Sequence, residues 1–151
     1  MSQRGGSVVT YVKYGQDIAS PIIDQGEADI ILAFERLEAL RALPYLKKGG
    51  KMIVNDRAIT PRPVITGATE YPAGIIEELK NHADVISLDA LSVAEAAGSA
   101  KAVNVVLIGV LAGSTEIPRD AWVNALKETV PPKFLDINLK AFDEGYAISA
   151  K

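Results

Sequence analysis

Residues Asp29-Ile30-Ile31-Leu32-Ala33-Phe34 form a nearly continuous apolar run, which is typical of a strand covered on both faces. Directly behind this run, Leu37, Leu40 and Leu43 recur at helical spacing, and Pro44 marks the end of the helix. A buried strand followed at once by an amphipathic helix is the repeating unit of an α/β fold. We therefore expect residues 29–34 to lie in a parallel sheet.

Three further segments have the composition of strands. Residues 7–14 are rich in β-branched and aromatic side chains and stop at Gly15, so they predict a strand near the N-terminus. Residues 52–54 and 84–88 are short apolar runs of the buried type. The Lys-Lys-Gly-Gly-Lys stretch at 47–51 predicts a turn before the first of these runs.

The remaining apolar patterns predict helices, although nearly every position of residues 102–113 is apolar, so only the length of that segment favours a buried helix over a strand. The predicted helices cover residues 72–82, with Pro72 in the first turn, residues 90–97, which end at Gly98, residues 102–113, a helix opened by Pro118, and a last helix that ends near Gly145. Either Asp89 or Ser92 can cap the second of them. The whole pattern predicts a three-layer α/β fold, with a largely parallel sheet flanked by helices and a helical C-terminal third. No linker or repeat interrupts the chain, so we expect residues 1–151 to form a single domain.

Composition excludes several kinds of site. Sixteen basic and 19 acidic residues give a net charge of −3, which disfavours nucleic acid as a partner. The chain has no cysteine, so these residues can form no disulfide, cysteine nucleophile, cysteine-type zinc site or cysteine-bound iron–sulfur cluster. With one histidine, His82, a multi-histidine metal site is also excluded, and we predict no metal site.

Hydropathy predicts a cytoplasmic protein that does not enter the membrane. The longest near-apolar stretch, residues 102–113, is too short to span a bilayer. The first residues lack the long apolar core of a secretory signal.

Three places are candidate binding or interface sites. In Gln3-Arg4-Gly5-Gly6 the glycines allow close approach of a ligand and the arginine can pair with phosphate or carboxylate, although the sequence alone favours a flexible N-terminal turn. Glu35 and Asn55 follow predicted strands, and ligands of α/β sheets bind beyond the carboxyl ends of strands. The alternatives are that Glu35 complements the helix dipole and that Asn55 belongs to a turn. No combination of residues forms a catalytic constellation, so we predict no catalytic residue in this chain.

Several segments of the chain together carry a resemblance to a known family: Met1–Val9, Gly26–Glu35 with Leu37–Arg41, Leu46–Gly50, Ile53–Asn55, Val103–Gly109, Val130–Lys133 and Asn138–Phe142. They resemble the gamma-type subunit of 2-oxoacid:ferredoxin oxidoreductases, and the Gln-Arg-Gly-Gly-Ser segment at 3–7 is similar to that of the small (beta) subunit of the indolepyruvate enzymes. The segments cover essentially the whole chain in order.

The resemblance implies a subunit of an enzyme that decarboxylates a 2-oxoacid oxidatively, with indolepyruvate or a related aryl pyruvate as the substrate. Thiamine diphosphate, magnesium and iron–sulfur clusters are expected on a larger partner subunit, electrons pass to ferredoxin, and the acyl group leaves on coenzyme A. The resemblance implies a place on the substrate or coenzyme A side or at the subunit interface for Gln3, Arg4, Gly5, Gly6 and Glu35. Asn55 is a candidate for the same side because it follows a predicted strand. The chain alone is expected to be inactive.

Members of this family begin with a further strand and helix, which contain a Gly-x-Gly-Gly-x-Gly turn, ahead of the Gln-Arg-Gly-Gly segment. This sequence starts at that segment, so we expect the unit to be lacking, a strand edge to be exposed and the chain to self-associate. Two other functions compete with the subunit hypothesis. One is a stand-alone α/β module that binds a nucleotide-like ligand, and the other is a purely structural assembly domain.

Overall fold

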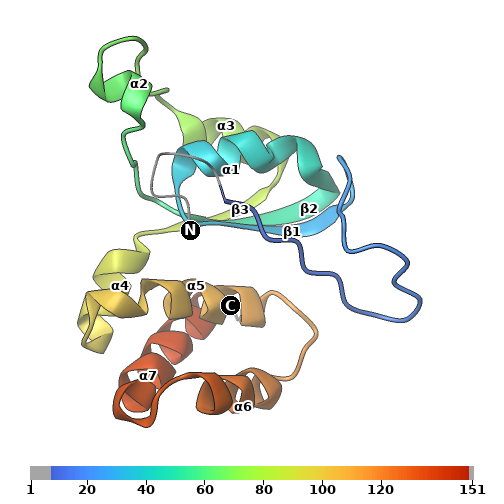
Figure 1. Cartoon of the computed structure of the whole chain (residues 1–151), viewed down its shortest axis with the longest axis vertical. Coiled ribbons are helices and arrows are strands. Elements are labelled where there is room, and N and C mark those ends of the chain that lie inside the picture. Colours follow the sequence, from blue (N-terminus) through green and yellow to red (C-terminus); the bar gives the residue numbers. More distant parts are fainter. Residues whose placement is uncertain (1–7, 150–151) are drawn as a thin grey trace. The chain divides into compact units, whose positions relative to one another are not determined.

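The computed structural model describes residues 8–149 and divides the chain into two compact units, residues 1–85 and 86–151 (Figure 1). The first unit contains most of the sheet, and the second is helical. The prediction that the whole chain acts as a single domain stays a prediction.

The sheet has three strands, β1 (Ala28–Ala33), β2 (Leu46–Asn55) and β3 (Asp84–Leu88), in the order β1-β2-β3. The strands are parallel, and in the register of the first pair Ala33 lies opposite Val54. A parallel sheet with helices and a helical C-terminal region confirms the predicted α/β class.

Strand β2 is longer than the sequence pattern predicts, and the predicted turn at 47–51 is wrong. These residues belong to the strand, and the register between β1 and β2 shifts there: Ala28 pairs with Leu46, whereas Ile30 pairs with Lys51. Gly49 has a φ of 79°, a left-handed conformation that glycine adopts without steric cost. The Lys-Lys-Gly-Gly stretch is therefore an irregularity inside a strand, where extra residues bulge from the ladder.

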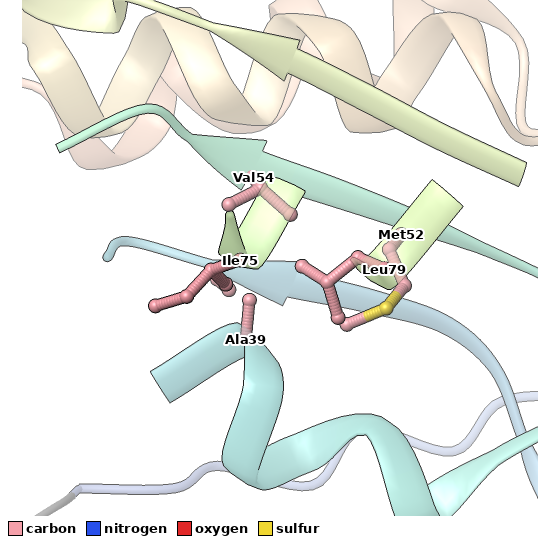
Figure 2. Close-up of a cluster of buried hydrophobic side chains, with 6 residues drawn as sticks. Ala39, Met52, Val54, Ile75 and Leu79 are labelled. Atoms are coloured by element: carbon pink, nitrogen blue, oxygen red, sulfur yellow. The ribbon is translucent and has the colours of Figure 1, made fainter. Parts of the chain in front are cut away.

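Helices α1 (Arg36–Ala42) and α3 (Ile75–His82) pack against the sheet through a common core, and a short 3-10 turn, η1 (Leu43–Tyr45), follows α1. The buried members of this core are Ala33, Ala39, Met52, Val54, Ile75 and Leu79, five of which are labelled in Figure 2. Met52, Val54 and Leu79 are fully buried. At about 25 cal/mol per Å² of apolar surface, each large side chain here contributes roughly 2 kcal/mol.

The predicted start of α3 at Pro72 is wrong, because the helix begins at Ile75. Gly74 precedes it with a φ of 68°, and such a left-handed residue cannot continue a right-handed helix toward the N-terminus. Between β2 and α3 the chain forms one short helix, α2 (Arg62–Ile65).

The strand predicted over residues 7–14 is also wrong where the structure describes it. Residues 8–27 contain neither strand nor helix. The side chains of this stretch are largely exposed: Val8 is 71% and Tyr14 is 68% accessible. A β-prone segment becomes a strand only when a neighbour pairs with it, and within the described residues these have no such neighbour.

The second unit contains α4 (Ala90–Ala97), a 3-10 turn η2 (Ala100–Ala102), α5 (Val103–Gly113), α6 (Arg119–Thr129) and α7 (Pro132–Ser149). Asp89 caps α4, because its Oδ1 atom accepts hydrogen bonds from the backbone N–H groups of Leu91 and Ser92, both at 3.1 Å. This resolves the choice between Asp89 and Ser92.

Helices α5 and α7 touch through their backbones. Gly145 lies in this contact, and the expectation that the last helix ends near Gly145 is wrong. A Cβ atom on Gly145 would lie 2.0 Å from the carbonyl oxygen of Val106, and one on Gly109 would lie 2.2 Å from that of Phe142. Gly145 is therefore an interior helical residue that allows close packing, not a terminator. The helix continues to Ser149.

Candidate functional site

Glu35 and Asn55 lie at the same edge of the sheet. Asn55 is the last residue of β2, and Glu35 comes two positions after the end of β1. Because β1 and β2 are parallel and Ala33 pairs with Val54, the two strands end side by side. Both side chains are almost fully buried, with exposures of 5% for Glu35 and 3% for Asn55. Their assignment to the substrate side, the coenzyme A side or an interface stays a prediction.

The carboxylate of Glu35 receives hydrogen bonds from three separate parts of the chain. Its Oε2 atom accepts from the backbone N–H of Glu38 at 3.0 Å, which caps helix α1. Its Oε1 atom accepts from the backbone N–H of Ile59 at 3.1 Å and from the hydroxyl of Tyr71. A buried carboxylate is stabilised by such donors, so Glu35 joins α1 to the segment that follows β2.

Asn55 and its neighbours connect the ends of the two strands. The Nδ2 group of Asn55 donates to the carbonyl of Phe34 at 3.3 Å. The backbone N–H of Arg36 donates to the carbonyl of Arg57 at 3.1 Å, and the side chains of Arg36 and Asp56 form an ion pair. The hydrogen bond to Asp56 raises the pKa of Arg36 above its usual range, so the guanidinium stays charged at all physiological pH values.

Tyr71 belongs to this site, and the sequence analysis missed it. Burial, together with the hydrogen bond to Glu35, raises its pKa to about 12, because both disfavour a charged phenolate next to a carboxylate. The phenol is therefore a hydrogen-bond donor throughout the physiological range. Tyr71 lies 36 positions from Glu35 in sequence, so no local pattern connects the two residues.

A groove of about 710 Å³ opens beside this cluster, between α1 and the segment that contains α2. Leu37 and Arg41 of α1 line one side, and Arg62, Val64 and Glu70 are among the residues on the other. Neither Glu35 nor Asn55 is part of this lining, since both side chains are directed to hydrogen-bond partners. The groove is chemically mixed, with two guanidinium groups, one carboxylate and apolar side chains.

The structure bears on some of the other sequence observations and not on others. Gln3, Arg4, Gly5 and Gly6 lie outside the described residues. His82 is exposed, and its Nε2 atom lies 3.0 Å from the carboxylate of Glu78 on the same helix. Residues 8–149 contain no group of three histidine or acidic side chains able to hold a metal ion, and no helix among them is long and apolar enough to cross a membrane.

Comparison with protein families matches residues 1–148 to the family described as pyruvate ferredoxin/flavodoxin oxidoreductase. The chain belongs to this family. Among curated relatives, the indolepyruvate oxidoreductase subunit IorB of Pyrococcus horikoshii is 42% identical over 96% of this chain and 75% of its own length. The IorB subunit of Archaeoglobus fulgidus is also 42% identical, over 100% of this chain and 78% of its own length.

Two solved structures share the fold of this family member. The gamma subunit of a keto/oxoacid ferredoxin oxidoreductase from Geobacter sulfurreducens superposes with a TM-score of 0.62 at 21% identity, covering 85% of this chain and 68% of that one. A 2-oxoglutarate:ferredoxin oxidoreductase from Magnetococcus marinus gives a TM-score of 0.59 at 20% identity, covering 85% of this chain and 21% of that one. That second structure contains 2-oxoglutarate, coenzyme A and succinyl-CoA.

Proposed function

We propose that this chain is a subunit of an indolepyruvate-type 2-oxoacid:ferredoxin oxidoreductase. The observation that carries the proposal is the identity of 34–42% with subunits named IorB, spread over 96–100% of the chain. In the proposed reaction a 2-oxoacid loses carbon dioxide, its acyl group is transferred to coenzyme A, and the two electrons released reduce ferredoxin.

We assign the redox and thiamine chemistry to a larger partner subunit. The 151 residues contain no cysteine, so they offer no thiolate ligand for an iron–sulfur cluster. In this proposal the partner also holds thiamine diphosphate and magnesium, and this chain contributes binding surface and orientation.

We expect that contribution from the strand ends that carry Glu35 and Asn55 and from the Gln3-Arg4-Gly5-Gly6 segment. Gln3, Arg4, Gly5, Gly6, Glu35 and Asn55 are the candidate residues on the substrate or coenzyme A side or at the subunit interface. For Glu35 and Asn55 the hydrogen bonds point to an indirect role, in which they fix the backbone that follows each strand.

Reconstitution tests the proposal. The isolated chain, the larger subunit alone and the two together are each supplied with indolepyruvate, coenzyme A, thiamine diphosphate, magnesium and an artificial electron acceptor. We expect reduction of the acceptor only when both subunits are present. Pyruvate and 2-oxoglutarate, offered instead of indolepyruvate, test the substrate class. Turnover by the isolated chain, or undiminished turnover by the larger subunit alone, contradicts the proposal.

We also propose that the isolated chain self-associates. Strand β1 is at an edge of the sheet, and residues 8–22 expose several large apolar side chains. Light scattering coupled to size exclusion measures the mass over a range of concentrations. A mass that grows with concentration, and that the larger subunit reduces to one defined complex, is the expected result. A monomer at all concentrations contradicts it.

A further inference from the structure

An arm, defined here as residues 60–70, leaves the sheet edge and returns to the same carboxylate. Its first flanking residue, Ile59, donates its backbone N–H to Oε1 of Glu35 at 3.1 Å, and its last flanking residue, Tyr71, donates its hydroxyl to the same atom. Figure 1 shows α2 and its flanking loops projecting from the sheet. Ile65, within α2, is 71% exposed.

The arm is held together by its own hydrogen bonds. The backbone N–H groups of Val64 and Thr66 donate to the carbonyls of Pro61 and Arg62, both at 3.0 Å, and the N–H of Ala68 donates to that of Pro63 at 2.9 Å. The hydroxyl of Thr66 adds a bond to Pro63 at 3.1 Å. All of these bonds join atoms of the arm itself, and none of them involves Glu35.

We propose that Glu35 is a clamp that closes this arm at its base, and that the arm opens as one body about residues 59 and 71 when the clamp is lost. The arm supplies Arg62, Val64 and Glu70 to one wall of the groove, while α1 supplies Leu37 and Arg41 to the other. Opening of the arm therefore widens the groove without unfolding the sheet. Glu35 is a positioning residue in this inference, and it acts independently of the proposed enzymatic role.

Two substitutions separate the role of Glu35 as a clamp from its role as the N-cap of α1. In Glu35→Ser the short hydroxyl still caps α1, because serine is a preferred N-cap residue, but it does not reach Ile59 or Tyr71. Tyr71→Phe removes one donor of the clamp and leaves the cap intact. The matched controls are Glu77→Ser, at a carboxylate on α3, and Tyr45→Phe, at a phenol in η1.

Residue-resolved amide hydrogen exchange of the full chain is the test. We expect exchange at Ile59 to accelerate on the order of tenfold in Glu35→Ser, because its N–H loses a charge-assisted hydrogen bond worth about 1.4 kcal/mol or more. In Tyr71→Phe the carboxylate of Glu35 is still there to accept from Ile59, so a smaller acceleration in this variant reports opening of the arm itself. Exchange at Thr66, Ala68 and the core strand residue Met52 stays unchanged, as it does at Ile59 in both controls.

Other outcomes overturn the inference. Unchanged exchange at Ile59 in both test variants shows that Glu35 does not close the arm. Acceleration that includes Met52 shows general loss of stability, and acceleration at Thr66 and Ala68 shows that the arm melts instead of moving as one body. If Glu35→Ser does not fold, Tyr71→Phe decides alone.

Discussion

The two units of the chain achieve close packing in opposite ways. In residues 1–85 the sheet and its helices meet through large side chains, such as Met52 and Leu79, and the strand ends are joined by the polar groups of Glu35 and Asn55. In residues 86–151 helices α5 and α7 meet where side chains are absent, at Gly109 and Gly145. The first unit should therefore be sensitive to the removal of atoms and the second to their addition.

The largest effect is expected from Gly145→Ala. The added Cβ would lie 2.0 Å from the carbonyl oxygen of Val106, and a backbone atom moves away only if the helices separate. The gain in helix propensity of about 1 kcal/mol is small beside this clash, and we expect a net loss of more than about 3 kcal/mol in the free energy of unfolding. Chemical denaturation followed by circular dichroism measures it.

Gly113→Ala is the control for this substitution. The nearest atom to a Cβ at Gly113 is the side-chain Oγ of Ser149, at 2.1 Å, while the nearest backbone atom is 3.1 Å away. A side chain at the end of a helix can rotate, so this variant should lose much less stability. Equal losses at both positions would show that backbone contact is not what limits α5 and α7.

Leu79→Ala tests the opposite sensitivity in the first unit. Leu79 is fully buried in the core between α3 and the sheet, and its truncation should lower the free energy of unfolding by about 3 kcal/mol. Ile65→Ala, at a side chain that is 71% exposed, is the matched control and should change little. If Leu79→Ala lowers the free energy of unfolding only slightly, the first unit is less sensitive to the removal of atoms than we infer.

A smaller, pH-dependent effect is expected from Tyr71→Phe. The pKa of Tyr71 is about 12 in the folded chain against 10.0 ordinarily, so its contribution to stability is complete below pH 10 and is lost as the pH rises toward 12. The stability difference between wild type and Tyr71→Phe should therefore close over this range. Denaturation midpoints from pH 8 to 12 measure it, and a constant difference would contradict the hydrogen bond to Glu35.

The smallest effect is expected from Asp89→Asn, which tests whether an exposed polar contact contributes to the stability of the helical unit. Hydrogen bonds from Ser92 lower the pKa of Asp89 below its ordinary 3.8, so the carboxylate stabilises α4 above that pH. This contribution is lost as the pH falls through the lowered pKa. Asparagine still caps the helix but does not titrate. The small difference in melting temperature at pH 7 should vanish in acid, and a difference that persists there would contradict the assignment.

The sequence predicted those features that depend on local periodicity. The apolar run at 29–34 became β1, and residues 90–97 form a helix that ends at Gly98, because each pattern is satisfied by burial along one element. The Lys-Lys-Gly-Gly stretch has turn composition, yet pairing with β1 keeps it in a strand. Residues 8–14 have strand composition, but pairing depends on a neighbour that composition does not specify.

The candidate site likewise has a part that the sequence predicts and a part that it does not. Glu35 and Asn55 could be located at the sheet edge because parallel strands end together. Their hydrogen-bond partners could not, because Ile59 and Tyr71 lie 24 and 36 positions from Glu35. The alternative interpretation of Glu35, in which it complements the dipole of the following helix, agrees with its position, because its carboxylate caps the N-terminus of α1.

The chain carries one tryptophan, Trp122, and the position of this residue makes it an optical probe of one unit. It packs with Val123, Leu139 and Tyr146 against the buried Phe142, and its indole N–H is shielded from water without a hydrogen-bond acceptor among the described residues. Its emission should be blue-shifted in the folded chain and should report loosening of α6 and α7. Loss of the sheet alone would be silent in fluorescence and visible in circular dichroism. Disagreement between the two signals would therefore identify which unit unfolds first.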